Sequence, residues 1–479
     1  MPKKSIKFTL CAAISALCVC ACAVLSSCGS APPKTRIAIG MWQGSSVYDA
    51  EFYEERIAAF EEAYPQYEIE VSPYVYDPET AVAKFASGQL PILFEMDASY
   101  ARGAYRNGHI RDVSAELKAL GWLDKADAFF LEEISDGGRV YGVPAEQYAA
   151  GMVLNLPLLC EAGVIGQDAQ GGYILYDAQG EPLYPDTFSE LLAASEAVVR
   201  HTSGGAYGAM IPSGDADCGR LFLDMVYNFG SERLEQRDEA GNWRLVLNTD
   251  AFGDAMRWVR SMSLEGCIDH SAQYGVEDWA AAMAAGEIAV AFCRSDSLST
   301  ALAAEPGLNG SIAFVPMPSA EGVNSSSVWG GTVFAVSSRA DSAQTEGAFL
   351  FLQFMGYGPD AGEGTFSVVE HNIRERSRQG VPVFPVLSVW EDEAYEAHLR
   401  AVYTEFQNVD AAYIREFYDG FDARKRSGEP HAREELYTLL DSLFDKMLFD
   451  ATTSNIVTLI ADGEREFTER YLSGIGSGE

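Results

Sequence analysis

The sequence of 479 residues lacks the patterns of the common catalytic and metal-binding motifs. It has six histidines and contains no GxSxG, HExxH or GxxxxGK[ST] stretch. Past residue 28 its cysteines stand alone, with no CxxC pair, at Cys160, Cys218, Cys267 and Cys293. We therefore expect no metal site and no cofactor, and we favour free thiols over one or two disulfides.

Basic side chains are also scarce. The chain has 34 Lys and Arg residues against 70 Asp and Glu residues, which gives a net charge of −36. Such a surface repels nucleic-acid phosphates and anionic lipid headgroups, so nucleic-acid binding and charge-driven membrane binding are not expected. With this many carboxylates, pairs arise by chance and no spacing singles out an acid and a nucleophile. A secreted glycosidase is therefore the least favoured function.

The N-terminus has the pattern of an export signal. Three lysines precede an apolar run from Thr9 to Leu25, which is too short for a permanent membrane span. The following Leu25-Ser26-Ser27-Cys28 resembles a bacterial lipobox. That resemblance implies a signal peptide over 1–27, cleavage before Cys28 and a lipid on its sulfur. Residues 28–34 then form a tether of at most about 25 Å, which holds the body at the outer face of the cell membrane.

Beyond the tether, strand and helix patterns alternate. Apolar strands are predicted at 36–41, 68–71 and 92–96, and helical spacing is seen at 53–64 and around 82–85. No further membrane span and no internal repeat is visible. The alternation predicts an α/β fold with mixed sheets flanked by helices, in which ligands gather at the carboxyl ends of strands.

Several short motifs occur in the order typical of one family. They are AVAKFASGQLP at 81–91, GHIRDV at 108–113, GRVYGVP at 138–144, Asn155, PDTFSELL at 185–192, AGEIA at 285–289 and the glycine pair at 330–331. In this order they resemble the family 1 extracellular solute-binding proteins of bacterial ABC importers, and the resemblance spans most of the mature chain. Ile92, Gly137 and Phe188 depart from the family's usual residues. Past Arg374 the sequence has little recognisable signature.

The resemblance implies a fold of two α/β lobes, the type II periplasmic-binding-protein-like fold, with three hinge crossings. The first lobe is expected over 35–145 and 332–371, and the second over 146–331 and 372–479. Closure of the lobes around a ligand would be what an ABC permease recognises. The protein is expected to be a monomer and not an enzyme.

Candidate ligand contacts follow from this arrangement. They are Trp42, Gln43, Ser45, Asp97 and Ser99 at first-lobe strand ends, Tyr148 and Trp329 at two crossings, and Arg294, Asp296 and Tyr227 in the second lobe. An aromatic face packs on a sugar ring, and a carboxylate accepts sugar hydroxyls. Asp97 and Ser99 are equally suited to capping a helix. Truncation to alanine of at least two of Trp42, Tyr148 and Trp329 is expected to weaken binding while leaving the stability of the empty protein nearly unchanged.

The ligand class stays open at this stage. A carbohydrate, and within that class an oligosaccharide, is favoured by the resemblance. A polyol, a glycerophosphodiester or a polyamine is the alternative, since the family includes such cases. A lipoprotein that senses a ligand and signals through a partner would use the same cleft.

Overall fold

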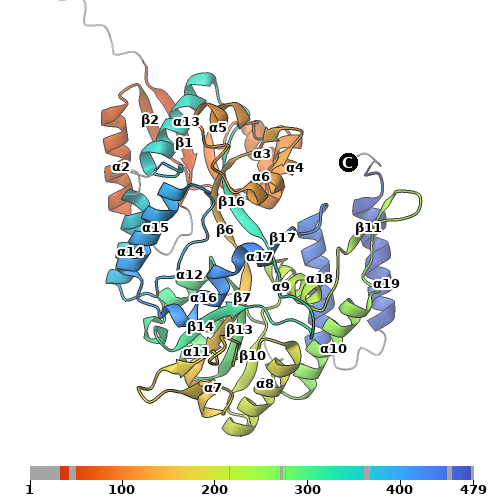
Figure 1. The fold of residues 1–479 in the computed structure, drawn as a ribbon. Coiled ribbons are helices and arrows are strands. Elements are labelled where there is room, and N and C mark those ends of the chain that lie inside the picture. Colours follow the sequence, from red (N-terminus) through yellow and green to blue (C-terminus); the bar gives the residue numbers. More distant parts are fainter. Residues whose placement is uncertain are drawn as a thin grey trace, which may run out of the picture.

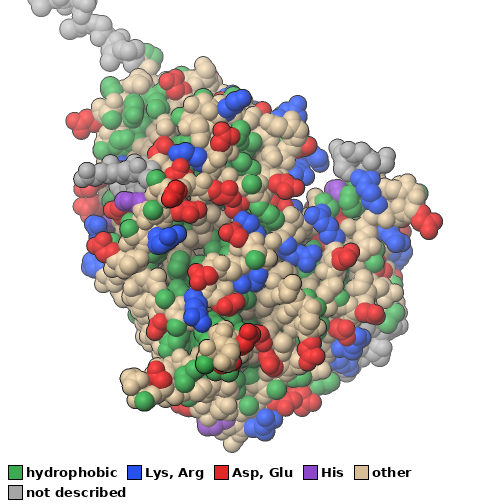
Figure 2. Space-filling view, viewed as in Figure 1, with side chains coloured by type: hydrophobic (Ala, Val, Ile, Leu, Met, Phe, Trp, Pro, Cys, Tyr) green, Lys and Arg blue, Asp and Glu red, His purple; other side chains and the backbone are tan. Residues whose placement is uncertain are grey.

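The structure, a computed structural model, describes residues 33–42, 50–214, 216–269, 273–275, 277–360, 367–449 and 456–475. Its elements form two lobes, each built around one sheet (Figure 1). The two-lobed, mixed α/β architecture expected from the sequence is confirmed. The signal segment 1–27 and Cys28 lie outside the described residues. Figure 2 shows acidic side chains spread over both lobes of the viewed face.

The first lobe is built on a five-stranded sheet in the order β2 (Tyr67–Val71), β1 (Thr35–Gly40), β3 (Leu93–Asp97), β16 (Gly330–Val336) and β6 (Val143–Tyr148). β1 pairs in parallel with β2 and β3, whereas β16 runs antiparallel to β3 and β6. Ile37 and Ile39 on β1 are fully buried because alternate side chains of a strand face the helices that cover it. Ile37 and Val333 therefore lie in one sheet.

The elements around this sheet are mostly short. They are α2 (Ala50–Ala63), α3 (Pro78–Ser87), η1 (Ala98–Tyr100), α4 (Ala101–Arg106), α5 (Ser114–Ala119), α6 (Ala128–Glu133), the hairpin of β4 (Ser135–Asp136) and β5 (Arg139–Val140), and α13 (Ser342–Met355). α13 begins with a capping box, in which Asp341 and Gln344 exchange side-chain and backbone hydrogen bonds.

The second lobe is built on a four-stranded sheet in the order β10 (Tyr207–Met210), β13 (Ile288–Arg294), β7 (Ala150–Asn155) and β14 (Ile312–Pro316). β7 runs antiparallel to both of its neighbours. Its flanking elements are α7 (Leu156–Glu161), β8 (Gly166–Gln167), β9 (Tyr173–Ile174), α8 (Phe188–Thr202), α9 (Ala216–Asn228), β11 (Glu235–Arg237), β12 (Trp243–Leu245), α10 (Asp250–Leu264), α11 (Trp279–Ala284), α12 (Leu298–Ala303) and η2 (Pro306–Leu308).

The helices of this lobe begin where the sequence supplies capping side chains. The hydroxyls of Thr187 and Thr249 accept hydrogen bonds from backbone N–H groups in the first turns of α8 and α10. The four cysteines of the described part are free thiols, and Cys218, Cys267 and Cys293 are buried, as favoured from their spacing.

The chain passes between the two lobes at three places. Ala149 joins β6 to β7, and Trp329 joins β15 (Ser327–Val328) to β16. The third passage lies at 407–410, between α15 (Glu393–Phe406) and η3 (Ala411–Tyr413). Both of the first two passages are short, so the ends of β6, β16 and β7 are held close together.

The contacts of the C-terminal part differ from the lobe boundary expected at 372. α14 (Ser367–Arg378) and α15 lie against the first lobe: Asn372 donates a hydrogen bond to the Tyr53 hydroxyl (3.2 Å), and Trp390 packs on Trp122. Further along the chain, Phe417 of the C-terminal part contacts Phe314 of β14 in the second lobe, with ring centroids 4.3 Å apart. No motif marks this change of lobe in the sequence.

The remaining elements complete the second lobe. They are α16 (Arg415–Asp419), α17 (Phe421–Arg424), β17 (Lys425–Arg426), α18 (Arg433–Phe449), α19 (Ile456–Phe467) and a π-helical turn (Thr468–Leu472). β17 pairs in parallel with β15, and α18 packs along α9. No helix in the described ranges has the length and apolar character needed to cross a bilayer.

Candidate functional site

A cavity of about 450 Å³ lies where the ends of β3, β6 and β16 face the second lobe. Its described lining comes from both lobes and is almost entirely polar: Asp97, Tyr100, Tyr148, Asp217, Arg220, Arg294, Asp296, Thr332, Glu434 and Tyr437. A cavity between lobes with a few convergent polar groups is the usual form of a small-molecule site.

Strand register explains the first-lobe wall. Thr332 on β16 lies directly opposite Asp97 of β3 on one side and Glu146 of β6 on the other. Residues opposite each other across antiparallel strands share a face of the sheet, so these three side chains form a row. Asp97 also caps η1 by accepting a hydrogen bond from the N–H of Ser99 (2.8 Å). Both readings proposed for Asp97 from the sequence, a cleft carboxylate and a helix cap, thus describe it.

Tyr148 links the first-lobe wall to the second lobe. Its hydroxyl donates to Asp97 (2.5 Å) and accepts from the guanidinium of Arg220 on α9 (3.1 Å). Arg220 and Arg294 also lie 4.8 and 4.6 Å from the centroid of its ring. Burial raises the pKa of the Tyr148 hydroxyl well above its ordinary value, so it stays protonated and can donate.

Arg294 forms the second-lobe wall. It is the last residue of β13, and its guanidinium donates twice to Asp296 (3.1 and 2.9 Å) and once to Asp217 (2.6 Å). This pairing fixes the planar guanidinium at the cavity rim, where such a group can also bind ligand oxygens.

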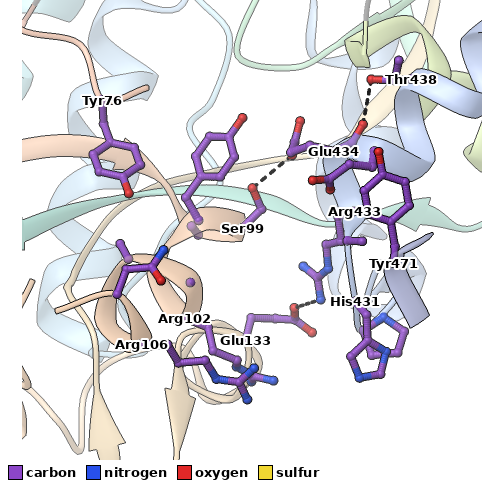
Figure 3. A pocket seen from close by; sticks show the side chains of 18 of the residues that line it. Tyr76, Ser99, Arg102, Arg106, Glu133, His431, Arg433, Glu434, Thr438 and Tyr471 are labelled. Carbon is purple, nitrogen blue, oxygen red and sulfur yellow. Dashed lines mark hydrogen bonds and ion pairs between the residues drawn. The ribbon is translucent and has the colours of Figure 1, made fainter. Parts of the chain in front are cut away.

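A larger groove of about 680 Å³ adjoins the cavity, and Tyr100 and Glu434 line both. It runs between the α4 region of the first lobe and the start of α18 (Figure 3). In Figure 3, Arg433 reaches Glu133 and Ser99 reaches Glu434 across this groove, at 2.8 and 3.2 Å. The cavity and groove together have room for a solute larger than a monosaccharide.

A segment that we call the strap, residues 425–434, connects both lobes beside the groove. In the second lobe Glu429 is fully buried and accepts from the N–H groups of Leu234 (2.7 Å) and Glu235 (2.9 Å). Toward the first lobe, Lys425 pairs with Asp127 (2.6 Å), and the Arg433–Glu133 pair noted above lies beyond it. The strap therefore couples the position of Glu434 in the cavity to the relative position of the two lobes.

Of the residues expected from the sequence to bind ligand, the structure brings together Asp97, Tyr148, Arg294 and Asp296 in the cavity. Ser99 lines the adjoining groove. Gln43 and Ser45 lie outside the described residues.

Trp42 packs inside the first lobe, and Trp329 is almost fully buried beside a small void that Asp97, Arg220 and Glu434 also line. Trp42 is 7% exposed, donates to the Tyr357 hydroxyl (2.7 Å) and stacks near Tyr53. Trp329 is 3% exposed and donates to Gln147 (2.9 Å) next to the ring of Phe130. With these contacts, truncating either tryptophan is expected to reduce stability, unlike the neutral effect expected from the sequence.

Tyr227 lies away from the cavity. Its hydroxyl donates to the buried Glu429, and the Arg426 guanidinium lies 3.4 Å from its ring centroid. It therefore anchors the strap within the second lobe.

Sequence reasoning did not select Arg220, Tyr100, Thr332, Glu434 or Tyr437. Arg220 had a usable signal, since it is the one basic residue of α9 and the apolar run Leu221-Phe222-Leu223 follows it. Glu434 and Tyr437 had none, because they lie in the C-terminal part that carries no motif.

Gly330 is the position where the cavity wall tolerates no side chain. A Cβ there would lie 2.2 Å from Arg220 Nη2 and 2.3 Å from Tyr148 Cε2. Gly330→Ala is therefore expected to displace this pair, lowering the free energy of unfolding by about 2 kcal/mol and weakening solute binding about tenfold. Thermal melts and titration calorimetry measure both effects.

Gly307→Ala is the control, since no atom lies within 4 Å of its Cβ. Unchanged affinity in Gly330→Ala would contradict the assignment.

Asp224 gives the hinge a pH dependence. It is 1% exposed and accepts from the N–H of Val328 (2.5 Å), and burial raises its pKa to about 7. When folding raises the pKa of a carboxyl, the protein is most stable below the pKa of the unfolded state. Its free energy of unfolding then falls as pH rises from that value to the pKa of the folded state. Asp224→Asn should therefore match the wild type near about pH 3, below the unfolded pKa, and become progressively more stable than the wild type as pH rises, by more than about 2 kcal/mol near about pH 8. A Tm difference that does not grow with pH would count against this.

No group of His, Cys, Asp or Glu suited to a metal ion occurs among the described residues. The described lining of the candidate site consists of carboxylates, guanidinium groups, tyrosines and a threonine hydroxyl.

Solved structures with the same fold are solute-binding proteins. One is the ABC transporter solute-binding protein of Thermotoga lettingae bound with α-D-tagatose (TM-score 0.66, 16% identity, 91% of this chain and 99% of that one). Another is maltose-bound MalE3 of T. maritima (TM-score 0.65, 16% identity, 90% of this chain and 99% of that one). A third is UgpB of Mycobacterium tuberculosis with glycerophosphocholine (TM-score 0.65, 15% identity, 92% of this chain and 98% of that one). A search of curated protein sequences returned no match.

A family model described as bacterial extracellular solute-binding protein matches residues 44–356, about two thirds of the chain. The match includes all of β3, β6, β13 and β16, so the strands that carry Asp97, Tyr148, Arg294 and Thr332 lie within it. It ends before α18, which adds Glu434 and Tyr437. The chain therefore belongs to the bacterial extracellular solute-binding proteins, and is a binding protein and not an enzyme.

Proposed function

We propose that this protein is the substrate-binding component of an ABC importer, that it captures a carbohydrate in the cavity between its lobes, and that it delivers this solute to the permease. The observation that carries the proposal is the polar lining of the cavity. Asp97, Arg294 and Thr332 offer hydroxyl-binding groups from both lobes, and Tyr100 and Tyr148 add aromatic rings.

The adjoining groove favours an oligosaccharide over a monosaccharide. A ligand that touches Asp97 in the first lobe and Arg294 in the second stabilises the closed arrangement by its differential affinity for that arrangement. The tagatose and maltose complexes of the structural neighbours agree with a carbohydrate ligand.

A thermal-shift screen tests the ligand class. The panel contains maltotriose, other linear and cyclic oligosaccharides, polyols, glycerophosphocholine and polyamines. A ligand present at about 100 times its Kd adds about 2.7 kcal/mol to stability, a shift that is readily measured. We expect an oligosaccharide to give the shift. A shift with a polyol or glycerophosphocholine and none with any saccharide would contradict a carbohydrate ligand.

We further propose that Cys28 is lipidated and holds the protein, as a monomer, at the outer face of the cell membrane. Support comes from the lipobox-like Leu25-Ser26-Ser27-Cys28 and from the extracellular family. Cys28→Ser is expected to move the protein from the membrane fraction to the medium, or to leave it unprocessed. A soluble wild-type protein with a different N-terminus would contradict the anchor.

A transport assay distinguishes delivery to a permease from ligand sensing. Deletion of the gene should abolish uptake of the radiolabelled solute, and a copy encoding the wild-type protein should restore it. Uptake that is unchanged in the deletion strain, with an altered transcriptional response to the solute, would favour the sensing lipoprotein.

A further inference from the structure

The charge balance of the cavity points to a narrower class of solute; this inference rests on the proposed function. The described lining includes four carboxylates, Asp97, Asp217, Asp296 and Glu434, against the two guanidinium groups of Arg220 and Arg294. These side chains come from both lobes, so the charge balance acts on any solute held between them.

The two arginines are already engaged. Arg294 is paired with Asp217 and Asp296. Arg220 donates to the Tyr148 hydroxyl and to the carbonyl of Val328 (3.1 Å each). Neither guanidinium forms an ion pair with Glu434, and no ion pair among the described residues includes Glu434.

Asp97 also forms no ion pair among the described residues, so Glu434 and Asp97 are the two lining carboxylates left for a cationic group. The Glu434 carboxylate accepts hydrogen bonds from the Ser99 hydroxyl (3.2 Å) and from the Tyr100 hydroxyl, and Ser99 is itself bound to Asp97 through its N–H. Burial, and then repulsion by Asp97, raise the pKa of Glu434, so its negative charge is held at a cost. A cation placed beside it would relieve that cost.

Aromatic rings border the same corner. Tyr100 and Tyr437 line the cavity together with Glu434, and Tyr100 also faces the outer groove. Carboxylates combined with the faces of aromatic rings favour an ammonium group over a neutral hydroxyl. The net charge of −36 adds a long-range attraction for cations.

We propose that the cavity selects a solute that carries a protonated amine, held by Glu434 and Asp97 and flanked by Tyr100 and Tyr437. Within the proposed function this is an amino sugar. A linear polyamine offers the same chemistry without the sugar ring, so the test includes both.

The test measures Kd by titration calorimetry for three matched trisaccharides and for spermidine. The three trisaccharides are the glucosamine trisaccharide, the N-acetylglucosamine trisaccharide and maltotriose. All titrations are made in a mildly acidic buffer that keeps the amines protonated. We expect the glucosamine trisaccharide to bind at least about tenfold more tightly than its N-acetylated form, and the preference to shrink as salt is added.

Glu434→Gln should remove this preference, raising the Kd for the glucosamine trisaccharide about tenfold while changing that for maltotriose less than about twofold. Glu132→Gln is the matched control, because Glu132 is exposed on α6, lines neither cavity nor groove and changes the net charge equally. Thermal melts of both variants establish that they are folded. The salt dependence of the wild type is a second readout that needs no variant.

The outcomes separate this inference from the proposed function. Maltotriose binding as tightly as the amine, or an amine preference that survives in Glu434→Gln, overturns the inference and leaves a carbohydrate-binding protein. Binding of spermidine alone supports the amine site and overturns the carbohydrate ligand. Binding of none of the four probes, in a folded protein, overturns the inference.

Discussion

Arg294→Met is expected to lower the affinity for the solute about 100-fold and the free energy of unfolding by about 3 kcal/mol. The arginine joins Asp217 and Asp296 at the cavity wall, and its side chain is 19% exposed. Methionine keeps most of the volume and removes the charge, which leaves two carboxylates facing each other without a partner. Titration calorimetry and denaturant unfolding measure the two losses separately.

Arg257→Met is the control for the loss of one positive charge. Arg257 is 69% exposed and pairs with Asp254 on the surface of α10, where an ion pair contributes little. We expect wild-type affinity and stability within about 0.5 kcal/mol. An Arg294→Met protein that binds as the wild type does would show that the solute does not contact this wall.

Gly219→Val is expected to cost about 3 kcal/mol of stability or more. α9 and α18 approach so closely that a Cβ at Gly219 would lie 1.8 Å from the carbonyl oxygen of Tyr437 and 2.9 Å from the N–H nitrogen of Asp441. Both atoms belong to the backbone, so the helices themselves must move apart. Because Arg220 is next in sequence and Tyr437 lines the cavity, affinity should fall as well.

Gly103→Ala on α4 serves as the comparison, since its Cβ would have no atom within 4 Å. It should gain about 0.5 kcal/mol or more from the better helix propensity of alanine. Thermal melts measure the stability of both variants. A Gly219→Val protein as stable as Gly103→Ala would mean that α9 and α18 are not packed as described.

Local sequence patterns predicted the first lobe well because its elements are short and periodic. The strand expected at 36–41 is β1, that at 68–71 is β2 and that at 92–96 is β3, each within a residue of its observed bounds. The helices expected near 53–64 and 82–85 are α2 and α3. Alternation of apolar residues carries this information without knowledge of distant parts of the chain.

The site was predicted in part, and the difference lies in long-range packing. Two of the predicted site residues, Asp97 and Arg294, follow predicted strands, and Tyr148 lies in the first predicted crossing between the lobes. The order of strands and crossings therefore brings these three residues together. Trp42 and Trp329 occupy similar positions in the sequence, but each is covered by other side chains. The Trp42 indole N–H donates a hydrogen bond to the Tyr357 hydroxyl. The Trp329 indole N–H donates to Gln147, and its ring packs against Phe130. Those partners are separated in sequence from the tryptophans, so no local pattern could show that the indoles are covered.

The C-terminal part escaped prediction for the same reason. α14 and α15 return to the first lobe, and the strap and α18 then complete the cavity with Glu434 and Tyr437. None of these segments has a motif, and their placement depends on side-chain contacts such as Asn372 with Tyr53 and Arg433 with Glu133.

A crystal structure of the protein with the solute that gives the largest thermal shift would show whether the cavity between the lobes is the binding site. We expect ligand density in that cavity, within hydrogen-bond distance of Asp97 or Tyr148 from the first lobe and of Arg294 from the second. Density confined to the outer surface of one lobe, with the cavity filled only by water, would contradict it.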